Sequence, residues 1–347
     1  MKKTLAALIV SAFAASAANA AVVYDNEGTK VELNGSLRLI LEKADAKKYD
    51  AVGNSTKTAN SALRNAGSRF GITVKHNLDN DFYALGRLES RFDDTESRDQ
   101  FGSLYAKRAY VGLGSKATGD ITFGRQLTIA DDLTQANDYE YGFIPKGKYI
   151  PTSGTGVVRY DYKGIEGLQL SANYNFGQTN DEKGNPLKPG IKNAYAVGAL
   201  YTVGDLDARL AYGHTNFETG ASYAHRLDGV LASLGYKFGD FTLTGDFAYG
   251  HEKFDDEKTN KFYVAPGFAY QVLPASKVYG NYLYERVKGE NTKDKTHGFL
   301  LGADYKLHKQ VVLFVEGKYV TTKEYVNDTY DGKTKDKAIG VGMRVFF

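Results

Sequence analysis

The sequence predicts an all-β chain that forms one 16-stranded antiparallel barrel across a membrane. Three observations predict this fold class. Apolar and polar residues alternate with a period of two from residue 31 to the C-terminus, and such alternation places each set on one face of a strand. The connections between the alternating runs are long and short in turn. The chain is polar, with a mean hydropathy of −0.41, and past residue 20 no run of about 18 apolar residues could form a spanning helix.

The first 20 residues have the features of a secretory signal peptide. Lys2 and Lys3 precede an apolar run over 5–13, and Ala18 and Ala20 supply the small-x-small pattern of a cleavage site. We therefore expect residues 1–20 to be removed and residues 21–347 to form a single barrel domain. Cleavage removes two lysines from the net charge of +3, which leaves a mature net charge of +1.

The predicted strands follow the alternation in chain order. In 31–39 the odd positions are apolar or glycine and the even positions are polar, and the last strand carries five apolar residues at alternate positions from Ile339 to Phe347. Helical spacing of apolar residues is not sustained anywhere. The sixteen predicted strands are 31–42, 64–77, 81–92, 104–114, 120–125, 156–162, 167–176, 193–203, 206–216, 227–238, 241–253, 261–272, 276–288, 297–307, 310–322 and 337–347.

The connections are of two kinds. Tight turns such as Gly204-Asp205 and Gly239-Asp240 are typical of two-residue hairpins. Long loops at one end and tight turns at the other are typical of outer-membrane barrels, whose turns face the periplasm and whose loops face outward. The eight predicted external loops are 43–63, 93–103, 126–155, 177–192, 217–226, 254–260, 289–296 and 323–336.

A soluble β-sandwich would show the same alternation, so the positions of the aromatic residues decide between the two folds. Tyr236, Phe238 and Phe241 flank a tight turn on the apolar face. Such a belt is typical of a membrane interface. In lipid every backbone polar group must be paired, which forces the sheet to close. We therefore expect the apolar faces to contact the lipid of an outer membrane.

The composition excludes several classes of function. The absence of Cys excludes a disulfide scaffold, a zinc ribbon and a cysteine nucleophile. Lys and Arg total 44 against 41 Asp and Glu, which is too balanced for a nucleic-acid partner. The six histidines are scattered, and neither Gly-x-Ser-x-Gly nor His-Glu-x-x-His occurs. We expect no metal, no cofactor and no catalytic residue, and hence a protein that is not an enzyme.

A series of segments, taken in order, resembles the general diffusion porins of Gram-negative bacteria. These segments are 21–35, 68–71, 109–113, 123–125 and 344–347. The segments 150–154 and 305–310 look closest to the major porin of the Haemophilus and Pasteurella group. The resemblance covers the whole mature chain. It implies a homotrimer in the outer membrane, with one water-filled pore per subunit for passive diffusion of ions and small hydrophilic solutes.

The resemblance also implies two features within the chain. The third external loop, 126–155, is expected to fold inward and narrow the pore, with its acidic residues facing basic residues on the barrel wall. A terminal Phe with apolar residues at alternate positions before it is expected to be the signal for the barrel-assembly machinery. Phe347, Val345 and Met343 fit that pattern.

The polar residues that alternate with apolar residues along each strand predict the basic side of the pore. If the apolar parity faces lipid, five arginines on neighbouring strands point into the lumen: Arg38, Arg69, Arg87, Arg108 and Arg159. Arg69 and Arg108 match the wall arginines of the family best. Arg159 lies several residues from the usual site.

The loop 126–155 supplies the acidic candidates, namely Asp131, Asp132, Asp138 and Glu140. It is the longest loop in the chain, and long loops without secondary structure are uncommon unless they are functional. The motif usual in the family is absent, and residues 138–142 stand in its place, which favours Glu140 first and Asp138 second. Acids opposite arginines would create a field across the channel, while the mature net charge of +1 predicts no strong ion preference.

Two other functions remain open on the sequence alone. A ligand-specific channel for sugars or phosphate would need aromatic residues along the lumen, and most aromatics here share the outward parity. An outer-membrane barrel enzyme would need a catalytic cluster near one rim.

Overall fold

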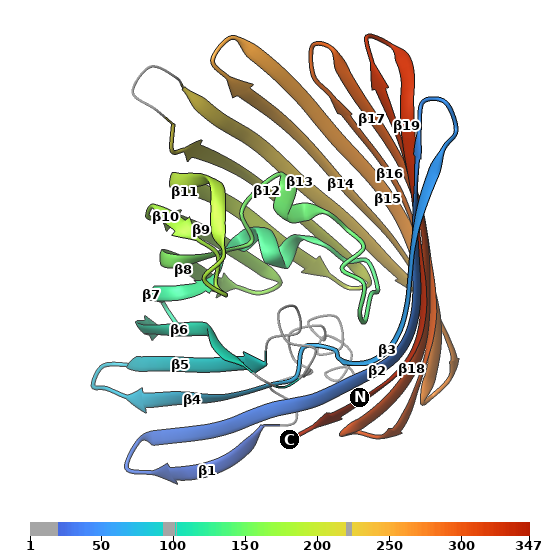
Figure 1. The fold of residues 1–347 in the computed structure, drawn as a ribbon. Coiled ribbons are helices and arrows are strands. Elements are labelled where there is room, and N and C mark those ends of the chain that lie inside the picture. The colour runs from blue at the N-terminus through green and yellow to red at the C-terminus, as the bar shows by residue number, and fades with distance from the viewer. Residues whose placement is uncertain (1–19, 93–100, 102, 220–223) are drawn as a thin grey trace.

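The chain forms one closed antiparallel barrel (Figure 1). The computed structural model describes residues 20–92, 101, 103–219 and 224–347. Within these residues 19 strands form a single sheet, which closes through the β19–β2 and β9–β11 pairings. The strands are β1 (Ala21–Asn26), β2 (Thr29–Asp50), β3 (Ser55–Asn65), β4 (Arg69–Asn77), β5 (Phe82–Phe92), β6 (Leu104–Ser115), β7 (Gly119–Leu127), β8 (Ser153–Ile165), β9 (Leu168–Asn175), β10 (Gln178–Asn180), β11 (Pro186–Val203), β12 (Leu206–Phe217), β13 (His225–Phe238), β14 (Phe241–Phe254), β15 (Glu257–Leu273), β16 (Ser276–Lys288), β17 (Thr292–His308), β18 (Val311–Val326) and β19 (Thr329–Phe346).

Sixteen strands make up the barrel wall in the part of the chain that the structure describes. β3 and β4 pair one after the other with the two halves of β2, so they count as a single wall strand interrupted at residues 66–68. The short β1 pairs with the start of β2, and the short β10 pairs with β11. The prediction of a 16-stranded antiparallel barrel is confirmed.

The outer face of the barrel is apolar at mid-height. Val315 on β18 pairs directly with Val341 on β19, and their side chains are 41% and 60% exposed. Glu316, the next residue on β18, points to the inside and is fully buried. In barrels of this kind such an exterior contacts lipid. Among the described residues, no helix is both long and apolar enough to cross a membrane.

The strands continue further on the external side than the alternation predicts. The prediction of loops over most of 43–63, 177–192, 254–260, 289–296 and 323–336 is wrong, because these ranges form extended hairpins. Beyond the membrane both faces of a strand meet water, so the alternation is lost while the hydrogen-bonded ladder continues. β1, which was also not predicted, pairs along the start of β2.

Two predicted segments lie outside the residues that the structure describes. The expected signal peptide, 1–20, is described only at its last residue, and the expected second external loop, 93–103, only at residues 101 and 103.

The connection between β7 and β8 folds into the barrel, as predicted (Figure 1). We call residues 128–152 the inner loop. It carries two short 3-10 helices, η1 (Ile129–Leu133) and η2 (Lys146–Lys148). η1 contacts β9, β11, β12 and β13 from within. The inner loop therefore occupies part of the lumen, on the side of β9 and β11–β13.

The C-terminal residue completes the barrel against β2. Gly35 and Phe347 exchange two backbone hydrogen bonds, with N–O distances of 2.8 and 3.1 Å. A Cβ atom on Gly35 would lie 2.4 Å from the Phe347 ring and 2.9 Å from the carbonyl oxygen of Arg69. The close approach of two strands and an aromatic ring therefore requires glycine at this position.

We expect Gly35→Ala to lower the stability of the closed barrel by about 1–3 kcal/mol, since the added methyl group overpacks the contact. The measurement is the temperature at which the folded barrel converts to the unfolded form on semi-native gels. Gly245→Ala is the matched control, because a Cβ atom there meets nothing within 4 Å. Equal conversion temperatures for the two variants would contradict the expectation.

Candidate functional site

The inner loop packs against small residues of the barrel wall. Ile129, Leu133, Tyr149 and Ile150 of the loop are at most 1% exposed. A Cβ atom on Gly229 of β13 would lie 2.2 Å from the carbonyl oxygen of Tyr149. Wall residues without side chains thus let the loop backbone approach the sheet, and the apolar loop residues fill the space.

Glu316 on β18 binds the middle of the inner loop. Its two carboxylate oxygens accept hydrogen bonds from the backbone N–H groups of Tyr139 and Glu140, at 2.8 and 3.0 Å. The hydroxyl of Tyr279 donates a third, at 2.6 Å. A fully buried carboxylate with three donors holds the loop at a defined height in the barrel.

Two further wall carboxylates bind other parts of the loop. Asp246 on β14 accepts hydrogen bonds from the backbone N–H groups of Gln135 and Ala136, at 2.9 and 3.1 Å. Glu285 on β16 accepts from the Tyr149 hydroxyl at 3.1 Å and pairs with Lys148 at 3.0 Å. The loop has no strand partner of its own, so these side chains satisfy its backbone and polar groups.

The opposite wall carries a dense group of arginines, which we call the arginine cluster: Arg38, Arg69, Arg87, Arg91 and Arg108 from β2, β4, β5 and β6. Glu89, 2% exposed, lies at its centre. Its carboxylate is 2.9 Å from Arg91, 3.0 Å from Arg87, 3.7 Å from Arg108 and 3.8 Å from Arg69. Arg38 binds the Ser36 hydroxyl at 2.7 Å and interacts electrostatically with Arg69 and Arg91.

The structure brings four of the five predicted arginines together and separates the fifth. Arg38, Arg69, Arg87 and Arg108 all belong to the arginine cluster. Arg159 on β8 instead forms ion pairs with Asp132 at 2.7 Å and Asp161 at 2.9 Å. With two carboxylates and an 11% exposed side chain, Arg159 fastens η1 to the wall.

The predicted acidic residues of the loop have separate partners. Asp131 pairs with Lys146 of the same loop at 3.1 Å, and it also interacts electrostatically with Arg108. Asp132 pairs with Arg159. The Asp138 carboxylate accepts hydrogen bonds from the N–H groups of Tyr141 and Phe143 and so shapes the loop itself.

Glu140 contacts the wall directly. Its carboxylate is 2.5 Å from Arg64 on β3 and 3.8 Å from Arg344 on β19. Arg344 in turn interacts electrostatically with Arg38 and Arg69, so Glu140 borders the arginine cluster. Burial raises the pKa of the Glu140 carboxyl, and Arg64 opposes that shift. A side chain that is only 7% exposed and paired in this way screens two arginines and contributes little free negative charge to the passage.

Sequence reasoning missed the residues that hold the loop in place. Glu316, Asp246 and Glu285 each lie on the inward parity of a strand. In the sequence Glu316 and Asp246 each stand between a glycine and an apolar residue, and Glu285 stands between Tyr284 and Arg286. A buried carboxylate needs donors, and that need is the signal that could have identified them. Arg64 and Arg344 lie on the inward parity as well.

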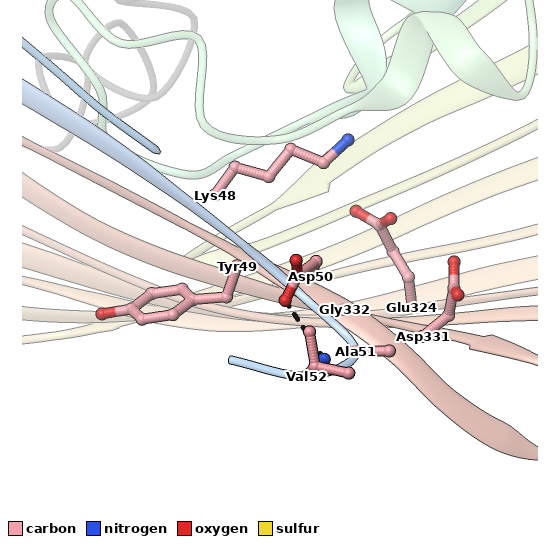
Figure 2. A pocket seen from close by; sticks show the side chains of 8 residues that line it. All are labelled: Lys48, Tyr49, Asp50, Ala51, Val52, Glu324, Asp331 and Gly332. Atoms are coloured by element: carbon pink, nitrogen blue, oxygen red, sulfur yellow. Dashed lines mark hydrogen bonds between the residues drawn. The ribbon is translucent and has the colours of Figure 1, made fainter. Parts of the chain in front are cut away.

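A shallow pocket lies at the external rim, away from the inner loop (Figure 2). It lies between the β2–β3 and β18–β19 hairpins and is lined by Lys48, Tyr49, Asp50, Ala51, Val52, Glu324, Asp331 and Gly332. The Asp50 carboxylate is occupied there by the backbone N–H groups of Val52 and Asn54, at 3.1 and 2.8 Å. No group of three or more possible metal ligands occurs in the described residues.

The sequence profile of the Gram-negative porins matches residues 4–325. The chain belongs to the Gram-negative porin family. It is 33% identical to the major outer membrane protein of Pasteurella multocida strain Pm70, over the whole length of both chains. The predicted resemblance to porins of this group is therefore confirmed, and the protein is a diffusion channel of the outer membrane.

Solved porin structures share the fold at low sequence identity. The trimer form of Vibrio cholerae OmpT matches with a TM-score of 0.71 and 17% identity over 92% of this porin and 100% of that chain. An anion-selective porin from Comamonas acidovorans matches with a TM-score of 0.67 and 20% identity over 92% and 100%. At these identities the likeness concerns the barrel architecture.

We expect Glu316→Ala to loosen the inner loop, because two buried backbone N–H groups lose their acceptor at a cost of about 1–3 kcal/mol each. The measurement is open-channel current noise in planar bilayers, which should rise several-fold. Glu324→Ala is the matched control, since Glu324 lies on the same strand and the same parity but at the external rim. Equal noise in both variants would rule out the role assigned to Glu316.

Proposed function

We propose that solutes cross this porin between the inner loop and the arginine cluster, and that the passage prefers small anions. The observation that carries the proposal is the charge of the cluster. Four of the five arginines contact the single carboxylate of Glu89, and Arg38 binds the Ser36 hydroxyl. Five arginines and one carboxylate leave a nominal excess of four positive charges on that wall. The acidic residues of the inner loop do not offset this excess, because most of them are paired with other partners.

The expected strength of the field suits a diffusion channel. A unit charge about 8 Å from an arginine interacts by about 0.5 kcal/mol at the dielectric constant of water and by about 2 kcal/mol at an effective value of 20. Interactions of this size concentrate anions and orient dipolar solutes without trapping them, and conduction requires that bound ions leave. The net charge of the whole chain, which predicts no strong ion preference, averages over residues far from the passage.

A ligand-specific channel is the second candidate, and the arrangement of lumen aromatics favours it less. Phe314 is the inward aromatic on β18, but it is 3% exposed and stacks on Tyr139 of the inner loop at a ring distance of 5.0 Å. Phe314 therefore supports the loop and offers no ring to a sugar in transit. Channel activity rather than catalysis is also what the family and the Pasteurella relative indicate.

Assembly completes the proposal. We propose that residues 1–20 are a cleaved signal peptide and that three mature copies associate in the membrane; the trimer form of the OmpT neighbour supports self-association. Phe347, Val345 and Met343 would be read by the barrel-assembly machinery before folding. Met343 and Phe347 are on the exposed outer face, at 42% and 39%, which suits contact with membrane lipid afterwards.

We expect Arg69→Gln and Arg108→Gln to shift the reversal potential in a tenfold salt gradient toward the value for cations, because each change removes one positive charge from the passage. The permeability ratio of anion to cation should fall by about twofold or more, as a loss of about 0.5 kcal/mol implies. Arg226→Gln, an exposed arginine near the external end of β13, is the control with the same change of charge. If all three variants match the unaltered channel, the arginine cluster does not line the passage.

Glu140→Gln should shift the reversal potential in the opposite direction, since it leaves Arg64 and Arg344 without their carboxylate. The same salt gradient measures the change, and Glu257→Gln, on an exposed external hairpin, is its control. A Glu140 variant with unaltered selectivity and conductance would place Glu140 outside the constriction.

A further inference from the structure

The wall strand formed by β3 and β4 is interrupted at residues 66–68, beside the arginine cluster. β3 pairs with β2 up to Asn65, and β4 resumes the pairing at Arg69. Their partners on β2 are Leu39 and Ser36, so three residues of this wall strand face two residues of β2. One extra residue in one of two paired strands is a β-bulge, and a bulge can turn a side chain or a backbone group in a new direction.

Two fully buried polar side chains, Asn65 and Ser68, close the interruption. The Ser68 hydroxyl accepts a hydrogen bond from the backbone N–H of Arg38 at 2.9 Å and donates one to the Arg38 carbonyl at 3.2 Å. The Asn65 carboxamide accepts from the backbone N–H of Ser68 at 2.8 Å and donates to the carbonyl of Phe92, at the end of β5, at 3.3 Å. Because lipid offers no water to satisfy the backbone, these side chains make the bulge a defined part of the wall.

The bulge directs the carbonyl group of Gly67 toward the side chain of Arg69. Arg69 Nε donates a hydrogen bond to the Gly67 carbonyl oxygen at 3.0 Å. Gly67 has a φ of +79°, which favours glycine, and a Cβ atom there would lie 3.3 Å from Arg69 Nη2. In a regular strand each carbonyl lies in the sheet and is paired with a neighbouring strand, so it is not offered to a side chain in the lumen. The bulge supplies such an acceptor beside the arginine cluster.

The Gly67 carbonyl holds the Arg69 guanidinium against the wall. Because Arg69 Nε binds a residue two positions earlier in the chain, the side chain folds back along the wall instead of extending across the lumen. Arg69 Nη1 lies 3.8 Å from the Glu89 carboxylate, which is longer than a hydrogen bond. Arg87 and Arg91 approach the same carboxylate more closely, at 3.0 and 2.9 Å. The position of Arg69 therefore depends on the Gly67 carbonyl, whereas Glu89 holds Arg87 and Arg91.

We propose that the bulge at residues 66–68 is a positioning device of the channel, in which Gly67 keeps the Arg69 side chain out of the passage while its charge stays in the arginine cluster. The inference rests on the proposed passage beside that cluster. Asn65 and Ser68 fix the backbone of the bulge and thereby the direction of the Gly67 carbonyl. With Arg69 released, its side chain would extend into the lumen and narrow the passage at an unchanged net charge. Gly67 is thus a residue that sets the size limit for neutral solutes.

A bulge that only shapes the wall is the alternative. Bulges also bend a strand and increase its twist, and such a role would need neither the Gly67 carbonyl nor the Arg69 side chain. The two roles differ in one measurable respect. A positioning role acts through Arg69 and disappears when that side chain is shortened, whereas an effect on the shape of the wall remains.

The test compares Gly67→Ala, Arg69→Gln and the double variant of the porin, each purified from outer membranes and reconstituted in liposomes. The measurement is the ratio of the swelling rates with a neutral trisaccharide and with a neutral monosaccharide. In Gly67→Ala this sugar ratio should fall by about half or more, since selection among neutral solutes depends on pore diameter. The permeability ratio of anion to cation should not fall in Gly67→Ala, because no charge is removed. In the double variant the sugar ratio should equal that of Arg69→Gln alone.

Two further variants control for backbone strain and for folding. Gly53 has a φ of +93°, and a Cβ atom there meets nothing within 4 Å, so Gly53→Ala should keep the sugar ratio of the unaltered porin. Arg69→Lys leaves the bulge as it is and keeps the charge, but it lacks the Nε–H donor. Arg69→Lys should therefore lower the sugar ratio as Gly67→Ala does, and it tests the proposal even where Gly67→Ala fails to fold.

Three results would overturn the proposal. If Gly67→Ala lowers the sugar ratio equally in the presence and in the absence of the Arg69 side chain, the bulge only shapes the wall. If Arg69→Gln shifts the reversal potential while Gly67→Ala and Arg69→Lys keep the unaltered sugar ratio, the passage beside the cluster stands and the positioning role fails. If Arg69→Gln shifts neither the reversal potential nor the sugar ratio, the passage lies elsewhere and the positioning role fails with it.

Discussion

Backbone pairing in a medium without water is the constraint on which this structure depends. A strand in lipid cannot leave an N–H or C=O group unpaired, so the sheet must close on itself. Closure determines which kind of residue stands at each outer position of the wall, because each strand then exposes one face to hydrocarbon and the other to the lumen. Closure also explains the contact between the C-terminal residue and β2. Gly35 has no side chain there, which allows Phe347 to form backbone hydrogen bonds with β2.

The inner loop meets the same constraint without a strand partner. Its N–H groups at Gln135, Ala136, Tyr139 and Glu140 are accepted by wall carboxylates instead of by a neighbouring strand. Carboxylates buried for this purpose are structural groups, and the same holds for acids on the loop that bind Arg159 or Arg64. In the proposed passage the electrostatics are therefore set by the charges that remain after the loop is held, which are the arginines around Glu89.

The barrel could be predicted from the sequence because the alternation of inward and outward residues is a local property of each strand, and every strand of the wall shows it. Arg38, Arg69, Arg87 and Arg108 converge because their strands are adjacent and their parity is the same. Parity cannot tell which inward arginine meets a carboxylate of the inner loop, so the separate place of Arg159 was not predictable. Nor was the continuation of the strands above the membrane, where water on both faces removes the apolar alternation.

The arginines of this porin differ by the source of their counterions. Arg159 and Arg209 have carboxylates on the protein, at 2.7 Å in each case. Arg159 pairs with Asp132 of η1 and so holds the inner loop against the wall, whereas Arg209 pairs with Asp207 of its own strand and donates hydrogen bonds to the carbonyl groups of Asp132 and Thr134. The arginine cluster has one carboxylate for five guanidinium groups, and the water of the lumen must supply mobile anions to balance it. The surplus of guanidinium groups over carboxylates on this wall is therefore the physical basis of the proposed preference for anions.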